Sequence, residues 1–219
     1  MTRRLAIKVD VDTLTGYLEG VPNLLALFRR LGIRASFFFS FGPDNSGKAI
    51  RRIFRRGFLG KMARTNAPGT YGLKTMLYGT LLPAPLIVPR NPDIFVETVR
   101  EGHDCGIHAW DHVEWQDKLD VMDDSRMRRH FAMASKMYSS LAGRPPSSCA
   151  APAWKVTPAS LAMQDEYGFS HCSDTRGTHP FLPAMGGRKF RTLQIPSTLP
   201  TMDEILGSKG MGKSEINDY

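Results

Sequence analysis

The sequence contains few cysteines, and it has no repeat and no low-complexity tract. Three cysteines occur among 219 residues, and none of them is arranged as C-x-x-C. Their odd number argues against a disulfide framework and fits a reducing compartment, so we expect Cys105, Cys149 and Cys172 to be small core residues. Prolines interrupt the apolar stretch at 71–89, which excludes a membrane-spanning helix there.

A signal peptide is not expected either. Residues 1–4 lead directly into an apolar strand candidate that already carries Asp10, which leaves no room for a cleavable apolar segment. We therefore expect a cytoplasmic protein. With 42% hydrophobic residues the chain can bury a sizeable core, and residues 1–219 are expected to form one domain.

The formal net charge of +8 predicts an acidic partner. Nucleic acid is not favoured, because the sequence shows no module that interleaves aromatic and basic residues on a reading surface. A negatively charged membrane face is the other candidate. We therefore expect the protein to lie peripherally on an anionic membrane surface.

Strand and helix signals alternate along the chain. Helix candidates begin with a proline or a cap residue and end before a glycine, as in Pro158–Tyr167 between Thr157 and Gly168. This alternation predicts an α/β fold with a parallel sheet that is closed or covered by helices. The strand candidates are 5–11, 35–41, 105–109, 148–151, 169–173 and 192–196, and the helix candidates are 22–31, 92–101, 125–142 and 158–167.

Two pairs of polar side chains stand where strand candidates end. Asp10 and Asp12 close the first candidate, and strand alternation places both carboxylates on one face while Val11 points into apolar packing. His108 and His112 are four residues apart, so both rings can converge on one point. Asp12, His108 and His112 are therefore predicted to bind one divalent metal with a position left for water, and Asp10 remains free to act as a base.

Either motif alone is weak. A D-x-D pair often only caps or solvates a strand end, and H-x-x-x-H occurs by chance on many helices. Two carboxylates as close as Asp10 and Asp12, however, repel each other unless a cation or a proton lies between them. The occurrence of both motifs, each at the end of a strand candidate, favours a metal site and hydrolytic chemistry.

A long interruption at about 43–89 breaks the alternation and exceeds an ordinary strand–helix loop. Its first half is predicted to form a basic amphipathic helix, and its second half an apolar loop. Such a segment suits a membrane surface, although a solvated helix packed on the rest of the domain explains the pattern equally well. The predicted membrane contacts are Arg51, Arg52, Phe54, Arg55, Arg56 and Phe58.

These motifs, with G-P-D-N at 42–45 and Q-I-P-S-T-L-P-T at 194–201, resemble the polysaccharide deacetylase superfamily along essentially the whole chain. H-A-W-D-H at 108–112 and the segment at 194–201 are most similar to its 4-deoxy-4-formamido-L-arabinose-phosphoundecaprenol deformylase branch. The resemblance implies a distorted, incomplete (β/α) barrel. It also implies a metal-dependent hydrolase that acts on the amide bond of a lipid-linked amino sugar.

The same resemblance implies zinc, cobalt, nickel or manganese as the metal, and a place on the inner face of the bacterial inner membrane. The implied process is lipid A modification, with polymyxin resistance as its consequence. The expected base and metal ligands are those that the spacing already indicates. Deacetylation of an N-acetyl sugar and an inactive metal-binding domain remain as alternatives.

Two further motifs of the resembled family fall on this chain with changes. Trp154 keeps an aromatic position beside an oxyanion-binding N–H group, but Ala150 replaces an arginine that orients the base. Lys155 or Arg176 could supply that charge instead. Asp174 and Arg176 resemble a fourth motif that faces the substrate, with a capped loop as the alternative.

The resembled family ends in a strand whose histidine protonates the leaving amine. The sequence stops before that strand, so we expect a C-terminally truncated domain without a general acid. Proton transfer of this kind typically contributes about 10²- to 10⁴-fold to the rate. His171 and His179 are the possible substitutes, and we expect both to be structural instead.

Overall fold

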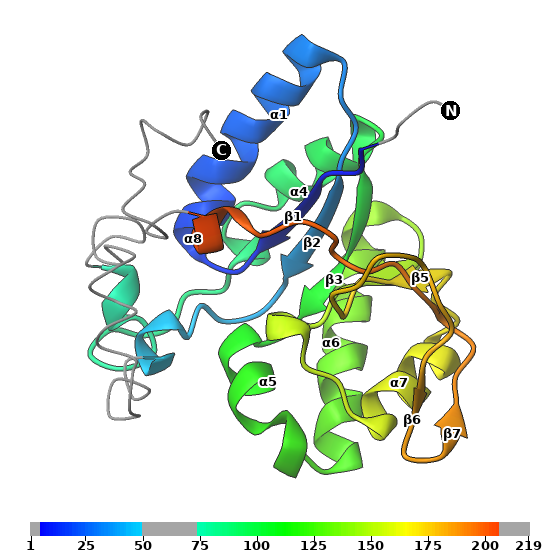
Figure 1. Ribbon diagram of the computed structural model, residues 1–219. Helices are drawn as coiled ribbons and strands as arrows, with labels where there is room; N and C mark the ends of the chain where they lie inside the picture. Colours follow the sequence, from blue (N-terminus) through cyan, green and yellow to red (C-terminus); the bar gives the residue numbers. More distant parts are fainter. Residues whose placement is uncertain (1–4, 50–73, 206–219) are drawn as a thin grey trace.

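The computed structural model describes residues 5–49 and 74–205, and its centre is a six-stranded parallel sheet (Figure 1). The strand order is β1-β2-β3-β4-β5-β8, so neighbours in the sheet follow one another along the chain. The predicted α/β fold is confirmed. Within the described residues β1 and β8 form the two edges, so the barrel is not closed. The strands are β1 Lys8–Val11, β2 Ser36–Ser40, β3 Asp104–Ala109, β4 Ser148–Cys149, β5 His171–Cys172 and β8 Leu193–Gln194.

Four long helices lie between these strands, where the capping signals predict them. They are α1 Val21–Leu31, α4 Pro92–Arg100, α6 Asp124–Ala142 and α7 Pro158–Tyr167. Thr157 and Ser160 form a reciprocal capping box at the start of α7, and Gly168 ends that helix at a φ of 65°. The cap of α6 is Asp123, one residue before the predicted Asp124, and it accepts a hydrogen bond from the Arg126 N–H.

Several short elements were not predicted from the sequence. The most relevant is α5, His112–Lys118, because it begins at the second histidine of the H-x-x-x-H pair. A π-helix, η1 Gly16–Gly20, leads into α1, and the strands β6 Ala184–Met185 and β7 Arg188–Lys189 form a separate antiparallel hairpin. The others are η3 Thr75–Leu77, η4 Val88–Arg90, η5 Leu119–Val121, η6 Pro152–Trp154 and α8 Met202–Ile205.

The aromatic strand β2 is central to the core. Its phenylalanines are buried on both faces of the sheet, as expected for an inner strand of a parallel sheet. The Phe39 ring contacts the Phe95 ring of α4 edge-on with centroids 5.2 Å apart, and Phe95 contacts Tyr138 of α6 at the same centroid distance. This stack joins α4 and α6 to the sheet, and so it fixes β1 and β3, which flank β2.

The described ends of the interruption at 43–89 are anchored to the domain. The Asp44 N–H donates to the Pro85 carbonyl at 2.8 Å, and the Gly47 N–H donates to the Tyr78 carbonyl at 3.0 Å. Ile87 and Val88 are fully buried, so this part of the predicted apolar loop belongs to the core. The predicted membrane contacts lie outside the described residues: Arg51, Arg52, Phe54, Arg55, Arg56 and Phe58. None of the helices in the described residues has the length and apolar character needed to cross a membrane.

Replacing Phe39 by alanine tests the importance of the aromatic stack. The change should lower the free energy of unfolding by about 3–5 kcal/mol, because it removes a fully buried ring and leaves a cavity. Leu27→Ala on the outer side of α1, where the side chain is 37% exposed, should cost less than about 1 kcal/mol. Urea unfolding followed by circular dichroism measures both, and equal losses would show that the stack does not anchor the core.

Candidate active site

The three predicted metal ligands meet at the carboxyl edge of the sheet. Asp12 follows β1 directly, His108 lies near the end of β3, and His112 opens α5. Parallel strands present their carboxyl ends at one edge, which explains why residues almost a hundred positions apart in the sequence come together. One potential ligand atom from each of these residues lies within 4.8 Å of the other two. Val11 is buried on the opposite side, as predicted.

The Asp12 carboxylate faces both imidazoles. His108 Nε2 lies 3.1 Å from Asp12 Oδ1, and His112 Nε2 lies 3.6 Å from Asp12 Oδ2. The two rings have centroids 5.2 Å apart and are tilted by 34°. The His108 side chain is buried, whereas 41% of the Asp12 side chain is exposed, so the cluster is open on one side.

Backbone contacts fix the orientation of His108. Its Nδ1 lies 2.6 Å from the Ala150 carbonyl, which can only accept, so Nδ1 carries the hydrogen and Nε2 presents a lone pair in the neutral ring. Asp12 Oδ1 is buried and receives no hydrogen bond from the described residues. Two acceptors that face each other require a proton or a cation between them. This donor set therefore fits a divalent metal ion.

The charges at the cluster favour a positive partner for Asp12. Burial opposes the ionisation of Asp12, but the nearby His112 and His108 imidazoles outweigh it and hold the pKa well below its usual range. Burial also lowers the pKa of His108, and the negative charges of Asp10 and Asp12 more than compensate, so that this pKa is raised. The carboxylate thus stays ionised and stabilises a cation beside it.

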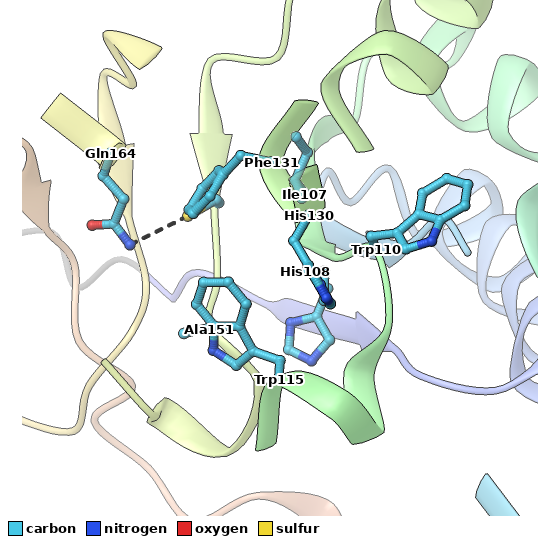
Figure 2. A pocket seen from close by; sticks show the side chains of 10 residues that line it. Ile107, His108, Trp110, Trp115, His130, Phe131, Ala151 and Gln164 are labelled. Atoms are coloured by element: carbon cyan, nitrogen blue, oxygen red, sulfur yellow. Dashed lines mark hydrogen bonds between the residues drawn. The ribbon is translucent and has the colours of Figure 1, made fainter. Parts of the chain in front are cut away.

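His108 is one of the residues that line a small, largely apolar pocket (Figure 2). Trp115, Phe131 and Ala151 line this pocket together with His108, and Gln164 closes it by donating to Cys149 Sγ at 3.6 Å. The apolar side chains of this pocket offer the His108 ring no hydrogen-bond partner. The ring edge that carries Nε2, which points toward Asp12, is therefore the part of His108 available for binding.

The G-P-D-N segment joins the two loops that carry the predicted ligands, a role that the sequence did not reveal. Asp44 Oδ2 accepts a hydrogen bond at 2.8 Å from the Leu14 N–H, just after the first ligand. Asn45 Nδ2 donates at 2.6 Å to Asp111 Oδ2, and Asp111 Oδ1 caps α5 through the Glu114 N–H at 3.0 Å. The Asp–Asn pair stands in a recognisable motif a few residues after β2, but its hydrogen-bond partners are distant in sequence.

The backbone beside Trp154 is strained. Ala153 and Trp154 have φ values of 53° and 52°, which is rare for residues other than glycine and is often found at functional sites. The Trp154 N–H donates to the Ala151 carbonyl at 3.1 Å, and the next N–H donates to the Pro152 carbonyl at 3.0 Å. These two groups are engaged within the turn, so the predicted oxyanion contact at Trp154 stays a prediction that needs another donor.

Asp174 is buried, and its carboxylate is surrounded by hydrogen-bond donors of the protein. Its carboxylate accepts hydrogen bonds from the Ala151 N–H at 2.6 Å, Gln164 Nε2 at 2.7 Å and Gln194 Nε2 at 3.0 Å. Burial raises the pKa of Asp174, and these donors oppose the rise. With 1% of the residue exposed, Asp174 joins the turn after β4 to α7 and β8, and the predicted substrate contact at Asp174 stays a prediction.

A second group of potential ligands surrounds Asp174. The Cys149 and Cys172 sulfurs lie 3.3 Å apart on adjacent strands, and both cysteines are free and buried, as is Cys105. The predicted role of the cysteines as core residues agrees with this placement. Because the Asp174 oxygens already accept several hydrogen bonds, this group suits a metal less well than the cluster around Asp12 does.

The cations that were expected to orient Asp10 are engaged elsewhere. Lys155 Nζ lies 2.5 Å from Asp120 Oδ2, and Arg176 pairs with Glu204 at 2.5 Å. The guanidinium of Arg176 also lies over the Trp154 ring, 4.4 Å from its centroid. The sequence-based expectation for Lys155 or Arg176 is therefore wrong, and Asp10 pairs instead with Lys8, at 3.0 Å between Nζ and Oδ2.

The two histidines considered as substitute acids lie in different surroundings. His171 opens β5 and its Nε2 lies 3.5 Å from an oxygen of Asp104, which opens β3. This is the amino edge of the sheet, opposite the cluster. His171 is therefore not placed to protonate a leaving group at the cluster. His179 is exposed, and its Nδ1 lies 3.0 Å from the Thr178 hydroxyl.

Solved structures share the fold at low sequence identity. A protein from Mycobacterium smegmatis assigned as a polysaccharide deacetylase is 19% identical with a TM-score of 0.58, over 88% of this chain and 58% of that chain. An allantoinase is 20% identical with a TM-score of 0.53, over 84% of this chain and 45% of that chain. These similarities support the fold alone.

Sequence relatives are closer. The probable 4-deoxy-4-formamido-L-arabinose-phosphoundecaprenol deformylase of Shewanella sediminis is 40% identical over 98% of this chain and 69% of its own length. The protein of the same name from Wigglesworthia glossinidia brevipalpis is 33% identical over 87% of this chain and 66% of its own length. The chain thus spans about two thirds of these relatives. The polysaccharide deacetylase model matches residues 9–171, and the chain belongs to this family of amide-bond hydrolases, as the sequence motifs predicted.

Proposed function

We propose that this chain is a metal-dependent deformylase that acts on a 4-formamido-arabinose linked to undecaprenyl phosphate, as a step of lipid A modification that leads to polymyxin resistance. The observation that carries the proposal is the convergence of Asp12, His108 and His112 beside Asp10. The names of the two sequence relatives supply the substrate class. Removal of an acetyl group from an N-acetyl sugar is the second candidate, because the matching family model is that of polysaccharide deacetylases.

Asp12, His108 and His112 would hold the metal, which we propose to be zinc, cobalt, nickel or manganese. A bound divalent ion polarises the formamide carbonyl and lowers the pKa of a water molecule. Asp10 takes a proton from the attacking water, and oxygen adds to the formyl carbon. The C–N bond breaks as the nitrogen gains a proton, which balances the proton that Asp10 took from water, and formate and the sugar amine leave.

Separate variants of the two aspartates distinguish the base from the metal ligand. Asp12→Asn should weaken zinc binding about 10-fold or more, because it removes a charged ligand. Asp10→Asn should keep zinc but lower formate release about 10²- to 10⁴-fold, because it removes the base. Isothermal titration with zinc and an enzymatic formate assay measure the two effects. Equal loss of zinc in both variants would rule out the proposed division of roles.

Asn45→Ala tests the connection between the ligand loops. The change removes the hydrogen bond that Asn45 donates to Asp111, and the metal affinity should fall about 10-fold because α5 and His112 lose support. Asn23→Ala in α1 serves as the control, since it removes the same amide outside the site. Competition with a chromophoric chelator gives both affinities, and an unchanged Asn45→Ala affinity would contradict the supporting role.

We propose that residues 43–89 bring the enzyme to an anionic membrane surface on the cytoplasmic side of the inner membrane. Thr15, which precedes η1 three residues after Asp12, lies close to Thr75, with 3.0 Å between the hydroxyl oxygens. The described end of the segment therefore lies beside the site, and Leu81 there is 81% exposed. A lipid-linked substrate requires this kind of proximity between membrane surface and metal.

Liposome flotation tests the membrane proposal. The chain should bind anionic vesicles at low salt and bind less at high salt, because each cation near such a surface contributes about 1 kcal/mol that salt screens. Replacing Arg51, Arg52, Arg55 and Arg56 by Glu should release the protein while zinc affinity stays unchanged. Equal binding to neutral vesicles, or no binding to anionic ones at low salt, would contradict the proposal.

A further inference from the structure

Lys8 is a cation beside the site, and its contacts involve none of the three predicted metal ligands. Its Nζ pairs with Asp10 Oδ2 at 3.0 Å and donates to the Ser173 carbonyl at 3.1 Å. The same Nζ lies 5.6 Å from the Phe38 ring centroid and 6.0 Å from that of Trp154. Ser173 follows β5, which three strands separate from β1, so Lys8 reaches across the sheet. These contacts leave the ammonium group little freedom.

The position of Lys8 follows from strand geometry. Lys8 and Asp10 are two residues apart on β1, so both side chains point to the same face as Asp12. The side chain of Lys8 is 21% exposed and that of Asp10 is 30% exposed. A half-buried ion pair of this kind holds its carboxylate more firmly than an exposed pair does, because solvent screens it less. One Asp10 oxygen is thereby fixed, and the other remains for a second partner.

Two adjacent carboxylates of equal chemistry would both be attracted to a divalent cation. Asp12 faces the imidazoles, whereas Asp10 has a lysine as its counter-charge. We propose that Lys8 is a positioning residue that holds Asp10 as the base and keeps this carboxylate from joining Asp12 as a second metal ligand. The inference rests on the proposed function, since it assumes that Asp10 acts on a water molecule next to the metal.

Lys8→Met removes the charge and keeps the length of the side chain, and Lys8→Arg keeps the charge. Lys155→Met is a matched control, because Lys155 has a similar exposure of 27%, its own carboxylate partner, and a backbone acceptor in the Gln116 carbonyl at 3.2 Å. Formate release gives kcat and KM, and chelator competition gives the zinc affinity. Each Lys8 variant is made with Asp10 present and in the Asp10→Asn background.

Lys8→Met should lower kcat at least about 10-fold with KM little changed, because the base loses its orientation. Lys8→Arg should recover most of kcat, and Lys155→Met should leave kcat and zinc affinity unchanged. With Asp10 present, Lys8→Met should also tighten zinc binding, because the released carboxylate joins the metal. The increase in zinc affinity caused by Lys8→Met should be about 10-fold larger when Asp10 is present than in the Asp10→Asn background.

The proposal would be overturned if Lys8→Met raised zinc affinity equally in the two backgrounds, or if Lys8→Arg did not restore kcat. Lys8 would then have only a structural role in joining β1 to the residue after β5. If Lys8→Met does not fold, Lys8→Gln takes its place, since it keeps a donor for the Ser173 carbonyl without the charge. A wild-type chain that binds zinc but releases no formate refutes the proposed substrate, and the affinity comparison still decides the role of Lys8. A wild-type chain that binds no zinc refutes both.

Discussion

The contact of the Asp12 carboxylate with two imidazole nitrogens is the interaction on which the rest of the site depends. It requires that the ends of β1 and β3 meet at one edge, which the parallel order of the sheet and the buried aromatic strand between them provide. It also requires fixed rings, which the Ala150 carbonyl and the Asn45–Asp111 contact support. Lys8 gives Asp10 a counter-charge of its own, so the two carboxylates of one short motif lie in different electrostatic surroundings.

The features that depend on nearby residues could be predicted from the sequence. The long helices follow from caps, prolines and glycines within a few positions, and the start of α1, the end of α4 and the start of α6 are each displaced by one residue. The predicted ligand set rests on two local spacings and on the strand ends where they fall. Asp12 and the two histidines then meet because the parallel sheet brings the ends of β1 and β3 to one edge.

The features that depend on distant partners could not be predicted. Nothing in the sequence around Lys8 indicates that its ammonium group would reach Ser173, 165 positions away. The contact from Asn45 to Asp111 likewise joins residues 66 positions apart. Lys155 and Arg176 were reasonable candidates to orient Asp10, but carboxylates on other segments bind them. The motif around Asp174 likewise did not reveal that Gln164 and Gln194 would donate hydrogen bonds to its carboxylate.

The most direct test of the proposed metal centre is the X-ray absorption spectrum of the protein loaded with one equivalent of zinc. A site made of Asp12, His108 and His112 predicts imidazole scattering and only nitrogen and oxygen neighbours, at about 2.0–2.2 Å. Sulfur neighbours at about 2.3 Å would place the metal instead at the buried group of Cys149, Cys172 and Asp174. That result, or a spectrum without imidazole scattering, would contradict the central claim.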